Sequence, residues 1–265
     1  TFQGADIQLN KNIKYGYRLD LKYNQMLKEN LKLVDRVHSI SEEISKNLIK
    51  LNFPKDKILE IPNCVNHEKL RKYKFSKPKI LTLITVARFA EKKKGFDFVE
   101  KISNQLLNKI KFKWIIIGKN VNKLNKNKFI SKNTANIKLI DEIKNDELFF
   151  PNSKLIKYYK SSSIYAHLSR IESFGITVLE ALSCGLPIIS FKSIGSKTLI
   201  KNGKNGYLIK DYNIKKYAEK IIETYKSKNK LLKSNLNDLA KYDLNLNADK
   251  SIKDYYRLIN NKLLN

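Results

Sequence analysis

The amino-acid sequence predicts an α/β protein whose main part is a doubly wound parallel sheet. Two observations support this fold class. Short apolar runs typical of buried strands alternate with segments of helical period, and the alternation is regular over residues 79–230. The chain has 265 residues, which is about one large domain or two small ones. A chain of this length buries roughly 70–75% of its unfolded surface, so a sizeable core is expected.

The N-terminal quarter of the chain contains few predicted strands. After a short apolar start at Thr1 and Phe2, the expected elements are a helix at 19–34, a strand at 37–40, a helix carrying Ile44 and Leu48, and a strand at 58–61. Ser39 and Glu42 have capping-box spacing just ahead of the second helix. Two or three strands are too few to close a domain. The polar stretch 66–78 is expected to be a linker to the next part.

The second part of the chain contains the regular alternation. The predicted strands are 80–86, 114–117, 137–140, 164–168, 187–190 and 207–209, and the predicted helices are 98–110, 153–160, 175–183, 214–225 and a C-terminal one at 249–264. Gly185 is expected to end the third of these helices as its C′ residue. The Lys- and Asn-rich stretch 119–127 is predicted to be a solvated loop.

The charge of the chain is strongly basic. Its 53 Lys and Arg against 25 Asp and Glu give a formal net charge of +28, yet only six of the basic residues are Arg. Two interpretations stay open: nucleotide-composition drift toward Lys and Asn, and an electrostatic role toward nucleic acid or anionic membrane. The scarcity of Arg disfavours specific nucleic-acid binding, because Arg makes the bidentate base and phosphate contacts.

Other compositional features narrow the class of protein. No apolar run approaches the roughly 20 residues that a membrane-spanning helix needs. Two cysteines, Cys64 and Cys184, are too few for a disulfide scaffold and are expected to be reduced thiols of a cytosolic protein. The chain shows no signal-peptide pattern and does not begin with Met, so a truncated sequence is expected.

Ligands of an open parallel sheet bind beyond the carboxyl ends of its strands, and one such loop runs from Ser169 to Ile176. Gly175 would let backbone amides approach a ligand at a helix start, where the helix dipole favours phosphate. Glu172 and Glu180 are eight residues apart, so on one helix they would point within roughly 80° of each other and could bind hydroxyls on either side of a phosphate. The alternative is that Glu172 only complements the helix N-terminus and Glu180 is a surface residue.

A second candidate loop follows the strand at 80–86 and has the sequence RFAEKKKG over residues 88–95. Arg88 supplies a planar fork of donors and a lysine beside Gly95 supplies a point charge, which together can bind a diphosphate. A solvated basic loop is the alternative.

Five stretches carry a family resemblance: ESFGITVLEALSCGLPIIS (172–190), RFAEKKKG (88–95), IPNCVN (61–66), KNGKNGYLI (201–209) and TFQGAD (1–6). They resemble the motifs of the retaining GT-B fold glycosyltransferases of family 4, the glycosyl transferases group 1, and they follow one another along the chain in the family's order. The motif at 172–190, with two Glu residues separated by seven residues and with its flanking sequence, is specific to the family. The other motifs are moderately specific. The resemblance covers nearly the whole chain.

The resemblance implies a role for each matching residue. Glu172 would face the donor sugar and stabilise the transition state, and Glu180 would bind the ribose hydroxyls. Arg88 and Lys94, with Lys93 as the alternative lysine, would neutralise the diphosphate. Backbone amides at Phe174, Gly175, Ile176 and Thr177 would hold the phosphate or sugar, and Gly4 and Asp6 would lie on the acceptor side. The resemblance implies no cofactor and no metal, and the scattered His residues and the lack of Asp-x-Asp agree.

The family has two Rossmann-like domains, and the resemblance divides this chain accordingly. Residues 1–65 would be the last part of an incomplete acceptor-side domain and 66–78 the interdomain linker. Residues 79–245 would be the donor-binding domain and 246–265 a C-terminal helix packing back on the N-terminal part. Roughly a hundred residues would be missing before Thr1, relative to the family's pattern.

Several positions depart from the family pattern. One extra residue separates Arg88 from Gly95, so the choice between Lys93 and Lys94 stays open. Gln3 stands where a His is common, Thr198 about where a Glu is common, and Cys64 and Asn66 where Gly and Asp are usual.

The resulting functional prediction is a retaining glycosyltransferase that uses a UDP-, GDP- or ADP-linked sugar and a glycan or lipid-linked acceptor, in polysaccharide or lipopolysaccharide synthesis. It is expected to be cytoplasmic with weak peripheral contact to anionic membrane at the inner face, and to bind no specific nucleic acid. The alternative from another class is a basic nucleic-acid- or membrane-binding module without catalysis. A degenerate, non-catalytic relative is a third reading, disfavoured because both Glu residues and the Arg/Lys pair are present.

Overall fold

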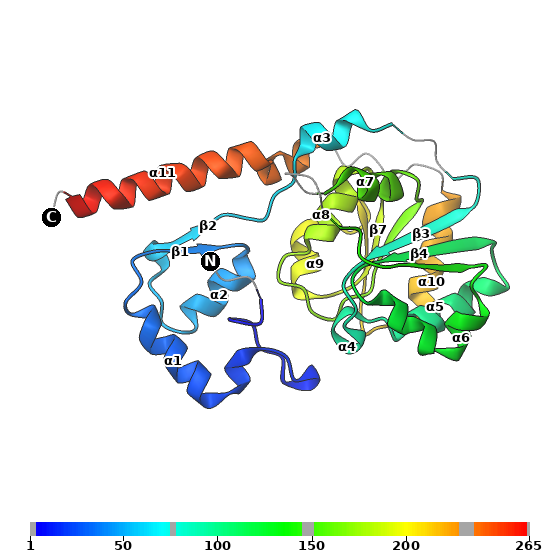
Figure 1. Ribbon diagram of the computed structural model, residues 1–265, viewed down its shortest axis with the longest axis horizontal. Coiled ribbons are helices and arrows are strands. Elements are labelled where there is room, and N and C mark those ends of the chain that lie inside the picture. The colour runs from blue at the N-terminus through cyan, green and yellow to red at the C-terminus, as the bar shows by residue number, and fades with distance from the viewer. Residues whose placement is uncertain (1–3, 75–77, 145–150, 228–235, 264–265) are drawn as a thin grey trace. The chain divides into compact units, whose positions relative to one another are not determined.

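The computed structural model (Figure 1) describes residues 4–74, 78–144, 151–227 and 236–263. The chain divides into two compact units. The first comprises Thr1–Cys64, Glu172–Phe174 and Leu239–Asn265, and the second comprises Val65–Ile171 and Gly175–Asp238. The predicted α/β class is confirmed in both units, since every strand pair in them is parallel.

The second unit is built on a six-stranded parallel sheet in the order β5-β4-β3-β6-β7-β8. The strands are β3 (Leu81–Val86), β4 (Phe112–Ile117), β5 (Ile137–Ile140), β6 (Ile164–His167), β7 (Ile188–Phe191) and β8 (Gly206–Ile209). The chain adds strands outward from β3 to β5, returns to pair β6 with β3, and then builds in the opposite direction. The sheet is therefore doubly wound, and its switch point lies between β3 and β6.

Helices cover both faces of this sheet, because right-handed crossovers in opposite directions place helices on opposite faces. In Figure 1, α5 and α10 lie on one face and α8 on the other. The helices are α3 (His67–Lys72), α4 (Glu91–Lys94), α5 (Phe98–Leu107), α6 (Lys128–Lys132), α7 (Ser153–Lys160), α8 (Ile176–Ser183), α9 (Ile194–Leu199) and α10 (Ile214–Lys226), with a 3₁₀ helix η4 at Val121–Lys126.

The core of the second unit explains why the strands read as continuous apolar runs. All of β3 except its last residue is buried, including the polar Thr82 and Thr85. The buried Trp114 Nε1 donates to Thr85 Oγ1 at 3.0 Å, and Tyr217 donates to the carbonyl oxygen of Ile189 at 2.7 Å. Because both faces of the sheet are covered, strands here need apolar side chains on both sides.

The first unit contains a two-stranded parallel sheet of β1 (Val37–Ser39) and β2 (Ile58–Glu60). Its helices are α1 (Leu21–Leu31), α2 (Glu42–Ile49) and α11 (Leu244–Leu263), with 3₁₀ helices η1 (Lys11–Ile13), η2 (Tyr17–Leu19), η3 (Lys55–Lys57) and η5 (Leu236–Tyr242), the last of which crosses the boundary between the units. Polar contacts that join α11 to the strands include His38 Nε2, which lies 3.0 Å from Asp254 Oδ2, and Lys250 Nζ, which donates to the carbonyl oxygen of Glu60 at 2.6 Å.

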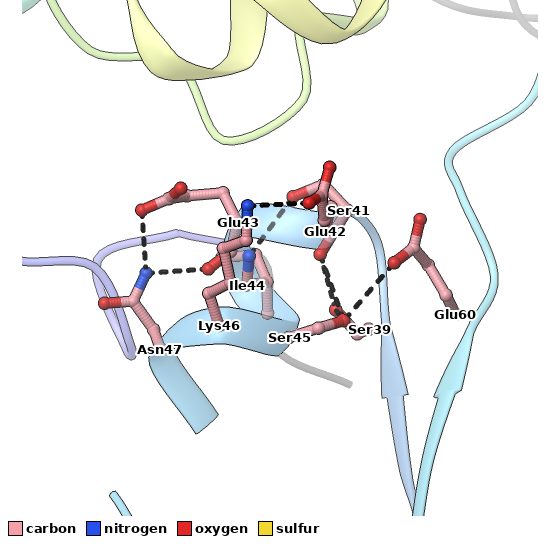
Figure 2. A network of polar contacts seen from close by, with 9 residues as sticks. All are labelled: Ser39, Ser41, Glu42, Glu43, Ile44, Ser45, Lys46, Asn47 and Glu60. Carbon is pink, nitrogen blue, oxygen red and sulfur yellow. Dashed lines mark hydrogen bonds and ion pairs between the residues drawn. The ribbon is translucent and has the colours of Figure 1, made fainter. Parts of the chain in front are cut away.

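The N-terminus of α2 corrects the predicted cap. Ser41, not Ser39, is the N-cap residue, and its Oγ accepts a hydrogen bond from Ile44 N. Figure 2 shows the polar contacts around this turn: Ser39 donates to the carbonyl oxygen of Ser41, and Ser45 reaches both Ser39 and Glu60. Ser39 is the last residue of β1, so its backbone serves the strand pair and cannot also begin the helix.

Two further expectations about secondary structure are corrected. The stretch predicted as a solvated loop at 119–127 contains η4, because Val121 and Leu124 are buried apolar anchors among its lysines. Helix α3, whose N-cap Asn66 side chain accepts from Lys69 N, lies within the stretch 66–78 that is expected to be the linker. The last helix begins at Leu244, five residues earlier than predicted, and α9 was not predicted. The predicted apolar start at Thr1 and Phe2 lies outside the described residues. Among the helices of the described residues, none combines the length and apolarity that crossing a membrane requires.

Candidate functional site

The two loops that the sequence selected meet beside the switch point of the second unit. One follows β3 and the other follows β6, the two central strands. Arg170 N donates to the carbonyl oxygen of Lys93 at 3.0 Å. Gly95 approaches Leu168 so closely that an added Cβ would lie 2.1 Å from the Leu168 carbonyl oxygen. The carboxyl ends of the central strands are where a doubly wound sheet binds its ligands.

Gly175 forms the start of α8, as predicted from its position ahead of the motif helix. Its φ of +92° is in the left-handed region, which favours glycine. The first helical hydrogen bonds run from Val178 N and Leu179 N to the carbonyl oxygen of Gly175. The N–H groups of Ile176 and Thr177 therefore precede the helical ladder and belong to the positive end of the helix dipole.

Two tyrosines fix the side chains of α8. Tyr165 in β6 donates to Thr177 Oγ1 at 2.7 Å, and Tyr159 in α7 donates to Glu180 Oε2 at 2.7 Å. Both tyrosines are fully buried. The hydroxyl of Thr177 and the carboxyl of Glu180 are consequently held by groups of the sheet and of α7. Sequence reasoning did not identify these tyrosines.

Glu180 is a buried carboxyl, and the interpretation of it as a surface residue is wrong. Only 4% of its surface is exposed. Burial raises the pKa of Glu180 from 4.5 to about 7, although the hydrogen bond from Tyr159 acts in the opposite direction. A buried, hydrogen-bonded carboxyl with a raised pKa beside a sheet switch point is typical of a functional site.

Glu172 lies in the segment Glu172–Phe174, which belongs to the first unit. Ser41 Oγ donates to the carbonyl oxygen of Ser173 at 2.9 Å, and Ser173 Oγ donates to Gln8 Oε1 at 2.8 Å. Phe174 packs edge-on against Tyr242. Since α8 begins at Ile176, Glu172 is outside the helix, and the helical angle predicted between the two Glu side chains does not apply.

The basic loop folds into a short helix, α4, that carries both candidate lysines. Lys94 N donates to the carbonyl oxygen of Ala90 at 2.7 Å, and the side chains of Lys93 and Lys94 are half-buried. Arg88 is exposed, and within the part of the chain that the structure describes its side chain has no hydrogen-bond or ion-pair partner. The stretch is therefore not simply a solvated loop, because it contains a helix with two half-buried lysines.

An ion pair that sequence reasoning missed joins the two loops. Arg170 Nη1 and Nη2 each donate to one oxygen of Asp97 at 2.6 Å. Arg170 lies in the loop after β6 and Asp97 in the loop after β3. A signal was available, because Arg is rare in this Lys-rich chain and a bidentate contact requires Arg.

The two residues predicted on the acceptor side lie in the first unit and contact each other. Gly4 N donates to Asp6 Oδ1 at 2.6 Å. An added Cβ at Gly4 would lie 3.0 Å from Ser173 Oγ and 3.1 Å from the Tyr15 hydroxyl, so a larger residue here would crowd both. Gln3, which occupies a position where the family often has His, lies outside the described residues.

Among the described residues, no three His, Cys, Asp or Glu side chains are grouped closely enough to hold a metal ion. A cavity of about 510 Å³ in the first unit lies between α1 and the stretch 51–57, and none of the predicted site residues lines it.

Comparison with known proteins identifies the family. Residues 66–241 match the family described as glycosyl transferases group 1. An uncharacterized glycosyltransferase of Haemophilus influenzae is 29% identical over 188 residues, which is 70% of this chain and 50% of that protein. The chain therefore spans about half the length of this curated relative. A probable sucrose-phosphate synthase of Thermosipho melanesiensis is 32% identical over 182 residues, which is 64% of this chain and 41% of that protein.

Solved structures share the fold. A glycosyltransferase of Rickettsia africae superposes with a TM-score of 0.70 at 18% identity, covering 92% of this chain and 67% of that one. HepE of Anabaena, solved in complex with UDP-glucose, superposes with a TM-score of 0.69 at 18% identity, covering 88% and 69%. Because the family match covers well over half of the chain, the protein belongs to the glycosyl transferases group 1, which adopt the GT-B fold.

Proposed function

We propose that this chain contains the nucleotide-sugar donor site of a retaining glycosyltransferase of family 4. The observation that carries the proposal is the meeting of two loops at the switch point of the second unit. One brings the N-terminal amides of α8 and the buried Glu180, and the other brings a basic helix and the exposed Arg88. A nucleoside diphosphate linked to a sugar has matching chemistry: two phosphates for the cations and amides, and ribose hydroxyls for the carboxyl.

Each residue has a proposed part in donor binding. Tyr159 donates to one oxygen of Glu180, and we assign the other oxygen to the ribose hydroxyls. Arg88 and Lys94, or Lys93 in its place, neutralise the diphosphate as it leaves. The amides of the stretch 174–177 hold the phosphate or the sugar. Glu172 is assigned to the donor sugar and its transition state, and Gly4 and Asp6 to the acceptor side.

The proposal needs no metal or other cofactor, because cations and helix-terminal amides aimed at developing negative charge can stabilise a leaving diphosphate. We favour a UDP-linked sugar, since the solved structures of HepE and of the pneumococcal O-GlcNAc transferase GtfA contain UDP with glucose or GlcNAc. GDP- and ADP-linked sugars are the alternatives. The proposed acceptor is a glycan or a lipid-linked glycan in cell-surface polysaccharide or lipopolysaccharide synthesis, at the cytoplasmic face of a membrane.

Calorimetric titration of the chain with UDP, GDP, ADP and a DNA duplex tests the proposal. We expect one nucleoside diphosphate to bind, and Glu180→Ala to weaken it by about tenfold or more, because a hydrogen-bonded carboxyl contributes on the order of 1.5–3 kcal/mol. Glu180→Gln, which keeps an acceptor for Tyr159, serves as a second variant should Glu180→Ala fail to fold.

Glu219→Ala is the matched control, because Glu219 is an exposed acidic residue on α10 of the same unit. Circular dichroism establishes that each variant is folded. A folded chain that ignores all three nucleotides and binds the DNA duplex tightly would show that the charge, not the motif, determines its partner.

A further inference from the structure

We infer that Arg170 and Asp97 are positioning residues for the diphosphate ligands, an inference that rests on the proposed donor site. Together they form what we call the loop clamp, which consists of Arg170, Asp97 and the carbonyl oxygens of Lys92 and Lys93. The clamp ties the lysine-bearing helix α4 to the strand end from which the motif loop begins. Neither residue is assigned a direct contact with the donor.

The hydrogen bonds of the clamp come from one side chain and one backbone group. The Arg170 guanidinium makes two parallel bonds of 2.6 Å to the Asp97 carboxylate and a third, of 2.7 Å, from Nη1 to the carbonyl oxygen of Lys92. The Arg170 backbone N donates to Lys93 O at 3.0 Å. Four hydrogen bonds therefore connect two segments that are more than 70 residues apart in the chain.

Two aromatic rings pack near the Arg170 guanidinium group and restrict its orientation. The Arg170 Cζ lies 4.0 Å from the ring centre of Phe98 and 5.5 Å from that of Tyr212. Stacking on a ring and bidentate pairing both need the flat fork of Arg, so Lys cannot replace it without loss. The carboxylate partner raises the pKa of Arg170, which keeps the guanidinium charged.

Asp97 pairs with Arg170 although its position at the start of a helix would also allow its side chain to cap that helix. It occupies the N-cap position of α5, yet its side chain caps no amide of that helix and pairs with Arg170 instead. An Asp at this position ordinarily accepts from the first-turn amides. The preference of Asp for capping the helix is thus overridden by a contact between two loops. Such departures from local preference are common where a fold positions functional groups.

The clamp acts on the site because its contacts fall on α4 itself. The carbonyl oxygens of Lys92 and Lys93 accept hydrogen bonds from Arg170. Lys93 and Lys94 are the two candidate phosphate ligands. Gly95, directly after them, packs against Leu168 O. Releasing the clamp would let the lysines move relative to the N-terminus of α8. A loosened pair of phosphate ligands weakens diphosphate binding more than nucleoside binding.

The test compares binding of UDP and UMP, because only UDP has the second phosphate. We expect Arg170→Lys and Asp97→Asn to reduce the ratio of UDP to UMP affinity by about fivefold or more, with UMP affinity within about twofold of the unmodified chain. Lys220→Gln, which breaks the exposed Lys220–Glu223 pair on α10, is the control and should leave both affinities unchanged. Thermal melting accompanies each variant.

The outcomes separate the two proposals. If the unmodified chain binds neither UDP nor another nucleoside diphosphate, the donor site itself is refuted. If it binds GDP or ADP, the same comparison is made with that diphosphate and its monophosphate. If it binds a diphosphate and the folded variants keep the same ratio, or lose both affinities in parallel with their melting temperature, the clamp is a structural pair only and the inference fails.

Discussion

Glu180 is the residue whose chemistry depends most on its surroundings. Its carboxyl is buried, its Oε2 accepts from Tyr159, and burial brings its pKa to about 7. The same burial raises the pKa of the Tyr159 hydroxyl well above 10, so this group remains a hydrogen-bond donor. A carboxyl that is protonated near neutrality can donate as well as accept, and ribose hydroxyls do both.

The raised pKa makes a prediction about stability. The folded protein keeps the Glu180 proton up to about pH 7, whereas the unfolded chain loses it near pH 4.5. The folded state therefore loses relative stability as the pH rises between these values, by roughly 2–3 kcal/mol from this one group. In Glu180→Gln this contribution is removed, so its free energy of unfolding should fall less from pH 5 to pH 8 than that of the unmodified chain.

Urea unfolding at pH 5, 6, 7 and 8 measures this difference. Glu219→Gln, on the exposed face of α10, should show the same pH dependence as the unmodified chain. Parallel pH curves for Glu180→Gln and the unmodified chain would contradict the assigned pKa.

At the scale of elements, the decisive feature is how tightly the loop after β3 packs on the loop after β6. Gly95 has a φ of +69°, and an added Cβ would lie 2.1 Å from the Leu168 carbonyl oxygen and 3.0 Å from the Phe98 ring. The position therefore excludes every side chain for two reasons, conformation and space. It lies directly between the lysines of α4 and Asp97 of the loop clamp.

We predict that Gly95→Ala destabilises the protein by about 2–4 kcal/mol, from the left-handed backbone and from the backbone clash together. Gly185→Ala is a matched control, because Gly185 has a φ of +81° but nothing lies within 4 Å of an added Cβ. This control should cost only about 1 kcal/mol. Urea unfolding gives both values, and equal costs would show that the close approach to Leu168 O is relieved by a small shift.

At the scale of the whole molecule, the net charge of +28 is the property that no single site explains. Charge of this size attracts anionic surfaces whatever its evolutionary origin. Compositional drift toward Lys and a peripheral membrane role both predict attraction to anionic lipid. They differ in the affinity expected, so a measurement of binding to lipid vesicles distinguishes them.

We predict weak binding to vesicles that contain anionic lipid at low salt, falling by about tenfold or more between 50 and 300 mM salt as screening increases. Vesicle co-sedimentation measures it, with purely zwitterionic vesicles as the control. The peripheral-membrane proposal fails if no binding to anionic vesicles is seen at low salt, whereas tight binding to DNA that depends steeply on salt would favour the nucleic-acid alternative.

The sequence by itself determined the fold class and the loops that carry the chemistry. Strands such as β3 and β7 are covered on both faces, so each reads as a short apolar run that local inspection finds. The topological rule for open sheets then selected the loops at Arg88 and Gly175, and the two-Glu motif indicated the family. These features depend on residues that are close together in the chain, so they can be recognised in the sequence.

Only the tertiary structure decided which groups act together. Nothing local to Glu180 shows that Tyr159 is buried with it and donates to its carboxyl. Nothing near Asp97 shows that its carboxylate pairs with Arg170 instead of capping α5. The physical reason is the same in each case. A polar side chain in a packed interior bonds to whatever group the fold brings within about 3 Å, and that group comes from another element.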